Sequence, residues 1–310
     1  MDLIVPVGGR TQWEVGGPAP AAEHETRAPG ALVRYEPADM TISVGAGMTF
    51  DALDAIVAPH GQEVPLDPRS RAATIGGLLA CGLSGPRRLR HGPLRDHVLE
   101  VRIALADGRV VKGGGPTVKN VTGYDLPRLF VGSLGTLGLI LEATLRCRPR
   151  PAVSRWCAAP AAASFHRPAA RLWDGTHEWV LLEGNRADVD AQSAPLPALD
   201  APPALPEGPH RGRVSVAPAR VRAVGAALDG DVRWCAEVGV GTVHVAADDV
   251  KGLERAREIA RAHDGWLLRE AGGAAADDGY GRPLPNLALM RRIKDAFDPE
   301  HRCNPGRMPL

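Results

Sequence analysis

Two glycine turns are the segments best suited to hold an anionic ligand. The first is the run Pro6-Val7-Gly8-Gly9-Arg10-Thr11-Gln12, which follows directly on a short apolar strand expected over residues 3–7. Paired glycines let the backbone curl so that consecutive N–H groups point to one side, and such a nest binds a diphosphate without a lysine. Thr11 adds a hydroxyl donor. Taken alone, this segment fits an ordinary turn equally well.

The second turn is Thr74-Ile75-Gly76-Gly77, where Thr74 has the character of a helix N-cap. Paired glycines at a helix start let an anionic group approach the free N–H groups of the first turn. The alternative is that these glycines serve only tight packing of the helix. The segment by itself does not decide between the two.

Other nucleotide-binding motifs are incomplete. Gly45-Ala46-Gly47 imitates the start of a dinucleotide fingerprint, but Phe50 stands where the third glycine belongs. The acidic residue expected at the end of the next strand is also lacking, which disfavours NAD. The sequence G-x-x-x-x-G-K-[ST] does not occur, which disfavours a P-loop nucleotidase.

A third glycine-rich region runs from Val118 to Asp125 and then from Gly132 to Ile140. Lys119 and Tyr124 are polar groups embedded in this region, as suits the wall of a ligand site. The three glycines at spacing three can instead relieve backbone crowding.

Apolar periodicity and turn residues predict an alternation of strands and helices around these motifs. Strands are expected at 41–45, 98–105, 109–112, 139–145, 178–183, 238–245 and 266–269. Helices are expected at 50–58, from Thr74 onward, from a cap at Asp248 or Asp249 to His263, and at 287–297, and a long polar loop is expected at 84–97.

Composition excludes several classes of protein. The 310 residues suggest two domains, and the net charge of +1 gives no basic field for nucleic acid. The five cysteines are scattered without a C-x-x-C pair, so neither a disulfide scaffold nor an iron–sulfur cluster is expected in this chain. No signal peptide or apolar stretch long enough for a transmembrane helix is evident, so we expect a cytoplasmic protein without direct membrane insertion, with membrane association through a partner left open.

In this order and spacing, the motifs resemble the FAD-binding domain of the vanillyl-alcohol oxidase/p-cresol methylhydroxylase (PCMH-type) superfamily, and within it the FAD-binding subunits of bacterial glycolate oxidases. The likeness covers about residues 3–150 and resumes at Phe297-Asp298-Pro299 and Cys303-Asn304-Pro305-Gly306-Arg307-Met308. It implies an α+β fold with a two-lobed FAD-binding domain at 1–150 and a smaller α+β cap domain at 151–285. The cap contains a Pro-rich loop near 195–209, and a C-terminal segment, 286–310, returns to the FAD domain.

The resemblance also implies the cofactor, FAD, and its contacts. The diphosphate would lie on the first turn, the ribityl chain and ring along the second turn and the stretch after it, and Ile140 would contact the cofactor through its backbone. The implied cofactor-binding residues are Pro6, Val7, Gly8, Gly9, Arg10, Thr11, Gln12, Pro68, Thr74, Ile75, Gly76, Gly77, Ala80, Gly82, Leu83, Ser84, Gly85 and Ile140.

The chain departs from that family in three ways. It begins at the diphosphate loop, without the leading helix of its relatives, and its cap is short. Hydroxy-acid oxidising members have a histidine-rich metal site, of which this chain contains only one histidine, His244, so we expect no metal site. Arg87, Arg88, Arg90 and Arg95 could bind a carboxylate or a phosphate but equally fit a solvated loop, and covalent flavin attachment at His91 is disfavoured.

The resemblance therefore implies an FAD-binding subunit of a complex that oxidises glycolate, a small 2-hydroxy acid. The implied partners are a sister FAD subunit, which would oxidise the substrate, and an iron–sulfur subunit that receives the electrons, so no catalytic residue is assigned here. The alternatives are a self-sufficient FAD-dependent dehydrogenase of a small hydroxy acid or sugar, and a flavin-free structural subunit.

Overall fold

The computed structural model describes residues 3–21, 25–115, 125–160, 163–228, 230–274 and 277–310. The chain divides into two compact units. Unit 1 comprises Met1–Gly85, Pro93–Arg150 and Pro283–Leu310, and unit 2 comprises Pro86–Gly92 and Pro151–Arg282. Each unit has its own sheet and its own buried core, and the candidate site lies in unit 1.

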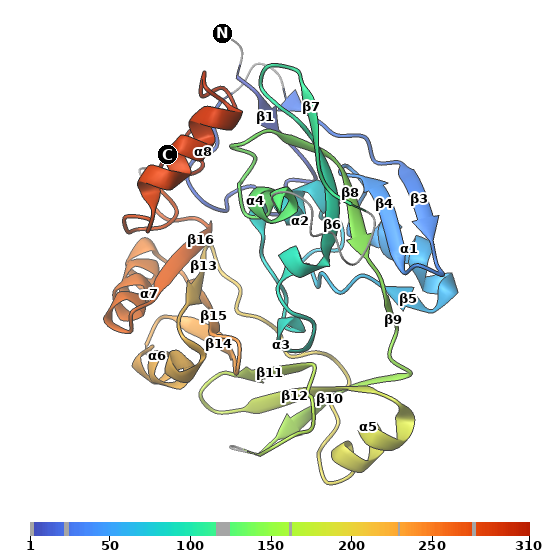
Figure 1. Ribbon diagram of the computed structural model, residues 1–310. Helices are drawn as coiled ribbons and strands as arrows, with labels where there is room; N and C mark the ends of the chain where they lie inside the picture. The colour runs from blue at the N-terminus through green and yellow to red at the C-terminus, as the bar shows by residue number, and fades with distance from the viewer. Residues whose placement is uncertain (1–2, 22–24, 116–124, 161–162, 229, 275–276) are drawn as a thin grey trace. The chain divides into compact units, whose positions relative to one another are not determined.

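Unit 1 is built on a five-stranded antiparallel sheet in the order β3-β4-β8-β6-β7 (Figure 1). Its strands are β3 (Leu32–Glu36), β4 (Thr41–Gly45), β6 (Val98–Ala104), β7 (Val110–Gly114) and β8 (Leu139–Arg146). Two short pairs accompany it: parallel β1 (Val5–Pro6) and β2 (Glu25–Thr26), and antiparallel β5 (Gln62–Glu63) and β9 (Arg148–Pro149).

The helices of unit 1 follow local capping signals. They are α1 (Phe50–Val57), η1 (Ala58–His60), α2 (Ile75–Cys81), η2 (Leu94–His97), α4 (Leu126–Phe130) and α8 (Leu287–Phe297). Thr49 accepts a hydrogen bond from Ala52 N at the start of α1, and Thr74 does the same for Gly77 N at the start of α2. The helices predicted to begin at Phe50 and Thr74 are thereby confirmed, and α8, which has no side-chain cap, begins at Leu287 as predicted.

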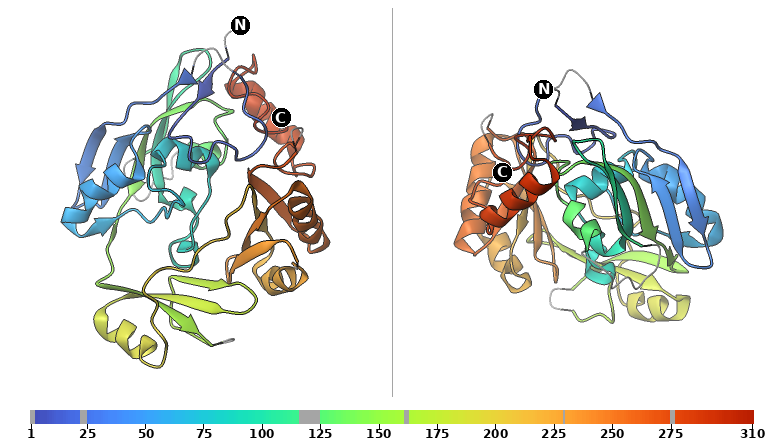
Figure 2. Two further views of the ribbon diagram at one scale, coloured as in Figure 1. Left: turned by 180° about the vertical axis from the view of Figure 1, so that it is seen from behind. Right: turned by 45° about the horizontal axis from the view of Figure 1, so that its top comes forward.

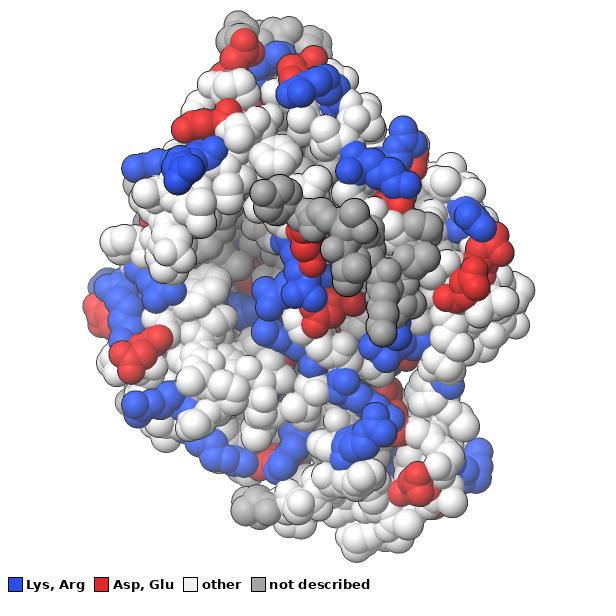
Figure 3. All heavy atoms as spheres, in the orientation of Figure 1, with Lys and Arg blue, Asp and Glu red and all other residues white. Residues whose placement is uncertain are grey.

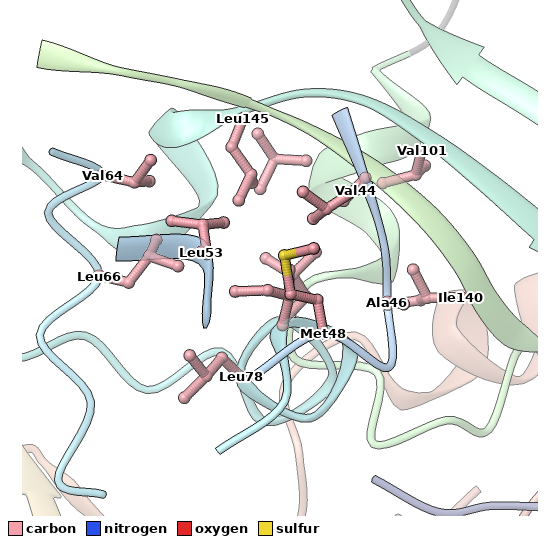
Figure 4. Packing of buried hydrophobic residues seen from close by; sticks show 14 of the residues in the cluster. Val44, Ala46, Met48, Leu53, Val64, Leu66, Leu78, Val101, Ile140 and Leu145 are labelled. Carbon is pink, nitrogen blue, oxygen red and sulfur yellow. The ribbon is translucent and has the colours of Figure 1, made fainter. Parts of the chain in front are cut away.

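The core of unit 1 fills the space between the sheet and helices α1 and α2. Figure 4 shows Leu53 of α1 and Leu78 of α2 packed against Val44 and Leu145 of the sheet. These four side chains are at most 1% exposed. Burial of large aliphatic side chains on this scale fixes α2 against β4 and β8, and this packing positions the glycine turns described below.

Unit 2 contains a seven-stranded sheet in the order β10-β12-β11-β14-β15-β13-β16. Its strands are β10 (Val153–Ala159), β11 (Ala170–Trp173), β12 (Glu178–Gly184), β13 (His210–Ser215), β14 (Arg233–Glu237), β15 (Thr242–Ala247) and β16 (Trp266–Ala271). Its helices are α3 (Arg88–His91), α5 (Arg186–Ser193), η3 (Pro218–Arg220), α6 (Val221–Ala227) and α7 (Val250–Ala262). Helices α6 and α7 lie beside strands β13–β16 (Figure 2), and apolar side chains of these elements form one buried cluster.

Two local predictions are wrong. The strand expected over 238–245 is a hairpin: β14 ends at Glu237, Gly239 and Gly241 turn the chain with φ of 87° and 96°, and β15 begins at Thr242. The polar loop expected at 84–97 contains two short helices, α3 and η2. Each is a single turn, too short to show a helical period in the sequence.

Candidate functional site

Two adjoining pockets of unit 1 are lined by both glycine turns. The Arg10 pocket, with about 510 Å³ of space including its open mouth, is lined on one side by residues 8–13. The Ile140 pocket, with about 420 Å³, extends to Ala46, Gly47 and Ile140. The two share six lining residues, Pro6, Gly8, Thr74, Gly77, Ala80 and Gly135. A ligand longer than either pocket can therefore lie across both.

The five residues of the turn from Gly8 to Gln12 all line the Arg10 pocket. Among the described residues, none accepts a hydrogen bond from the five successive N–H groups of this turn. Arg10 adopts a left-handed conformation, with φ of 55°, as one member of a nest commonly does. Val7 N donates to Thr26 O at 2.9 Å, and Arg27 Nη1 donates to Gly8 O at 2.9 Å, so the turn is held at its start. The turn is a pre-formed cradle for an anion.

The N–H groups at the start of α2 are already used. Ile75 N donates to Met48 O at 2.8 Å, Gly76 N to Ala46 O at 2.7 Å, and Gly77 N to Thr74 Oγ1 at 3.2 Å. The expectation that this helix offers free donors to an anion is therefore wrong. The acceptors of Ile75 N and Gly76 N belong to the segment after β4, which lies far from α2 in the sequence.

The two glycines of α2 have different roles. A Cβ on Gly76 would lie 2.9 Å from Ala46 Cβ and 3.1 Å from Ala46 O, so this glycine permits close packing of α2 on the chain after β4. A Cβ on Gly77 would meet only Thr74 Oγ1, at 3.1 Å, and Gly77 lines both pockets. A Cβ on Gly8 would collide with that same Thr74 oxygen, so the first turn packs directly on the cap of α2.

The Ile140 pocket is built from the chain after β4 and the start of β8. Ala46 N donates to Leu141 O at 2.8 Å, which holds Ala46 beside Ile140 (Figure 4). Gly138 approaches the backbone of β6 closely, since a Cβ there would lie 2.7 Å from Ala104 O. The wall is largely glycine and small apolar residues, which suits a flat, weakly polar group.

The C-terminal segment supplies the remaining wall of the Arg10 pocket. Asn304 N donates to Ile4 O at 2.9 Å, and Ile4 N donates to Arg302 O at 3.0 Å, so this segment lies along the N-terminal strand. Asn304 and Arg307 both line the pocket. The indole of Trp13 lies between two guanidinium groups, 5.0 Å from Arg10 and 5.5 Å from Arg307.

Comparison with known proteins identifies what this architecture is. A model of the FAD binding domain matches residues 4–114, and a model of the C-terminal domain of FAD linked oxidases matches residues 280–308. Both matched segments lie mainly in unit 1 and together include both turns and Asn304. The chain therefore contains an FAD binding domain and the C-terminal segment found in FAD linked oxidases. The prediction of FAD as cofactor is thereby confirmed.

Three curated proteins are similar to this chain in sequence. The chain is 37% identical over 153 residues to glycolate oxidase subunit GlcE of Escherichia coli (strain K12), covering 49% of this chain and 44% of that protein. It is 39% identical over 137 residues to a D-lactate dehydrogenase of Archaeoglobus fulgidus, covering 44% and 31%. It is 27% identical, over an alignment 397 positions long with gaps, to a D-2-hydroxyglutarate dehydrogenase of Xanthomonas citri pv. viticola, covering 98% of this chain and 84% of that protein.

Solved structures show the fold. Alkyldihydroxyacetonephosphate synthase superposes with a TM-score of 0.69 at 14% identity, over 98% of this chain and 71% of that one. The predicted α+β, PCMH-type FAD-binding fold is confirmed. The first two relatives named above are matched over less than half of their own length, 44% and 31%.

The predicted FAD contacts of this chain fall into two groups. Twelve line the pockets: Pro6, Val7, Gly8, Gly9, Arg10, Thr11, Gln12, Thr74, Gly76, Gly77, Ala80 and Ile140. Six do not line either pocket: Pro68, Ile75, Gly82, Leu83, Ser84 and Gly85. The Ile75 side chain is fully buried in the core, and Ser84 Oγ accepts from Leu94 N at 2.9 Å. Direct cofactor contact by any of the eighteen stays a prediction.

Sequence reasoning missed several pocket residues. Ala46 and Gly47 were weighed only as an NAD fingerprint, although their small side chains could have indicated a close approach to a ligand. Trp13, Asn304 and Arg307 gave no local signal, because only the fold brings the two ends of the chain together. The stretch Val118–Tyr124, predicted as a ligand wall, lies outside the described residues, and Asp125 caps α4 by accepting from Arg128 N at 3.3 Å.

The cations of the 86–92 segment are engaged within unit 2. Arg90 Nη1 donates to Glu183 O at 2.5 Å, Arg87 Nη1 lies 3.4 Å from Glu183 Oε1, and His91 Nε2 lies 3.8 Å from Glu183 Oε2. Burial alone would raise the pKa of Glu183, but the nearby His91 ring and the Arg87 charge outweigh it and hold that pKa below its usual range. These residues therefore have a structural function that explains their charge.

The C-terminal segment is fastened by a buried ion pair. Lys294 Nζ lies 2.5 Å from Asp298 Oδ2 and also donates to Thr136 O at 2.6 Å and to Cys303 O at 3.0 Å. Burial would raise the pKa of Asp298, but Lys294 and two backbone N–H donors hold it below its usual range. Burial raises the pKa of the Cys303 thiol to about 11, so this cysteine is unreactive at neutral pH.

His244, the one histidine that resembles part of the family's metal site, is buried on β15. His244 Nε2 lies 2.7 Å from Glu237 Oε1, and both residues are at most 1% exposed. In the described part of the chain, no three His, Cys, Asp or Glu side chains come together as a metal-binding group.

No helix among the described residues combines the length and apolar character needed to cross a bilayer. Basic and acidic side chains are interspersed over the face shown in Figure 3.

Proposed function

We propose that this chain is an FAD-binding subunit of a 2-hydroxy acid dehydrogenase complex, with glycolate as the first substrate to test. The observation that supports it most is the nest at Gly8–Gln12, whose five N–H groups lack acceptors among the described residues. A diphosphate supplies acceptors for such donors, whereas an empty turn leaves them to water.

The residues present fit the parts of FAD. The nest would hold the diphosphate, and the space beside Gly77 would let the cofactor pass between the two pockets. The small-residue wall at Ala46, Gly47 and Ile140 would take a flat, weakly polar ring. When bound, FAD supplies an acceptor for the hydride that leaves the α-carbon of a hydroxy acid.

The names of the relatives support the substrate class. Glycolate, D-lactate and D-2-hydroxyglutarate, which appear in these names, share a hydroxyl on the carbon next to a carboxylate. We propose the same class for this chain, with no catalytic residue assigned to it.

The partners we propose are a sister FAD subunit and an iron–sulfur subunit, in the cytoplasm or at a membrane through a partner. The isolated cysteines support a separate electron carrier, since four of them are buried and all five are free thiols. In this arrangement, the sister subunit oxidises the substrate, and the present chain supports assembly or electron transfer.

A self-sufficient dehydrogenase is the second candidate, supported by the match to D-2-hydroxyglutarate dehydrogenase over 98% of this chain. The two candidate functions are distinguished by adding glycolate, D-lactate or D-2-hydroxyglutarate, in the absence of oxygen, to the FAD-loaded chain alone and to the chain with its sister subunit. Bleaching of the visible absorption by the chain alone supports self-sufficiency. Bleaching that requires the sister subunit supports the complex, and bleaching by none of these acids in either preparation contradicts the substrate class.

A further inference from the structure

One buried oxygen in the Arg10 pocket lacks a hydrogen-bond partner. Asn304 is 4% exposed and lines this pocket, and its Oδ1 atom has no partner among the described residues. Its other amide atom, Nδ2, donates to Leu134 O at 2.6 Å. A carbonyl cannot donate, so this bond fixes the orientation of the amide and leaves the oxygen as the atom without a partner.

A buried acceptor without a donor is unfavourable, and native proteins rarely retain one without a reason. The same pocket contains a second such atom, Gln12 Oε1, which is also buried and unpartnered in the described part of the chain. Two acceptors at one pocket call for a ligand that carries several donors. A diphosphate carries none, whereas the sugar parts of a dinucleotide carry several hydroxyl groups.

We propose that Asn304 Oδ1 accepts a hydrogen bond from a sugar hydroxyl of the bound dinucleotide, an inference that rests on the proposed function. The C-terminal segment is then part of the cofactor site as well as a cover for the N-terminal strand. Cofactor binding and docking of this segment stabilise each other, because the same residue serves both. Asn304 is a cofactor-contacting residue outside the two glycine turns.

The test compares FAD binding by three variants of the full chain with that of the wild type. Asn304 has a φ of 44°, so Asn304→Gly removes the side chain at a backbone conformation that glycine adopts freely. Ser133→Ala is the matched control, since Ser133 is 5% exposed and its unpartnered Oγ lies outside both pocket linings. Asn304→Ala also removes the amide but keeps the Cβ, at a left-handed backbone conformation that alanine adopts less readily than asparagine.

Loss of one hydrogen bond predicts that Asn304→Gly binds FAD about 3- to 10-fold more weakly, with Ser133→Ala unchanged. Asn304→Ala, which also lacks the amide, should weaken FAD binding to a similar extent. Dissociation constants come from quenching of tryptophan fluorescence, and the FAD-induced rise in melting temperature gives a second readout. FMN and ADP distinguish the source of the hydroxyl, since FMN carries only the ribityl chain and ADP only the ribose.

Equal FAD affinity in wild type and Asn304→Gly overturns this inference and leaves the proposed function standing. If Asn304→Gly does not fold, Asn304→Ala decides, and an affinity for FAD equal to that of the wild type overturns the acceptor role. Failure of the folded wild type to bind FAD contradicts the proposed function, and this inference falls with it.

Discussion

Gly77→Val separates ligand binding from folding at the centre of the proposed FAD site. Gly77 lies within α2 and lines both pockets, and a Cβ there would have one neighbour within 4 Å, Thr74 Oγ1 at 3.1 Å. A small shift of Thr74 relieves that contact. Valine is also a slightly better helix residue than glycine, so the apoprotein should keep its stability within about 1 kcal/mol.

The bound state should be affected much more strongly. Two extra methyl groups beside Gly77 would occupy the space through which the cofactor passes, and overpacking of this kind costs about 1–3 kcal/mol. At 1.4 kcal/mol for each factor of ten, FAD binding should weaken by about 5- to 150-fold. Fluorescence titration with FAD measures the affinity, and circular dichroism with thermal melting confirms the fold.

A valine at an exposed helix position is the matched control. Ala52 lies on the exposed side of α1 and lines neither pocket, so Ala52→Val should bind FAD as the wild type does. A folded Gly77→Val protein with the affinity of the wild type would refute the placement of FAD across the two pockets.

Gly76→Val should lower the free energy of unfolding by about 1–3 kcal/mol in the apoprotein, because its side chain meets Ala46, and urea denaturation should show it as clearly less stable than Gly77→Val. Lys294→Met leaves the Asp298 carboxylate buried without its cation and should cost about 3–5 kcal/mol, and an unchanged urea midpoint would contradict the role of the pair. The folded pKa values of Glu183 and Asp298 lie below the usual carboxyl range, so their stabilisation is complete above that range and is lost as pH falls through the folded values. The melting temperature should therefore decrease as the pH is lowered below about 4, and this decrease should be smaller in Asp298→Asn.

Local signals predicted the elements that carry the site. Thr49, Thr74 and Asp249 each accept from a backbone N–H three residues later, and each begins a helix where the sequence placed one. Capping involves only neighbouring residues, so the sequence contains all the information required. The hairpin at Gly239–Gly241 was missed because alternation of apolar residues continues through the turn on both sides.

The site itself was predictable only in part. The nest at Gly8–Gln12 depends on its own residues, and the structure shows the unpaired donors that its glycines suggested. The donors at the start of α2 were misjudged because their acceptors, Ala46 O and Met48 O, reach them only through tertiary packing. The orientation that leaves the buried Asn304 oxygen without a partner among the described residues depends on Leu134, which lies far away in the sequence.

The visible absorption spectrum of the purified, folded chain after incubation with excess FAD and removal of unbound ligand tests the account most directly. We expect a flavin spectrum that corresponds to one FAD per chain and that is strongly reduced in Gly77→Val but retained in Ala52→Val. A colourless wild-type protein with an intact circular dichroism spectrum would contradict the claim that the backbone turn at Gly8–Gln12 and the helix face at Gly77 hold this cofactor.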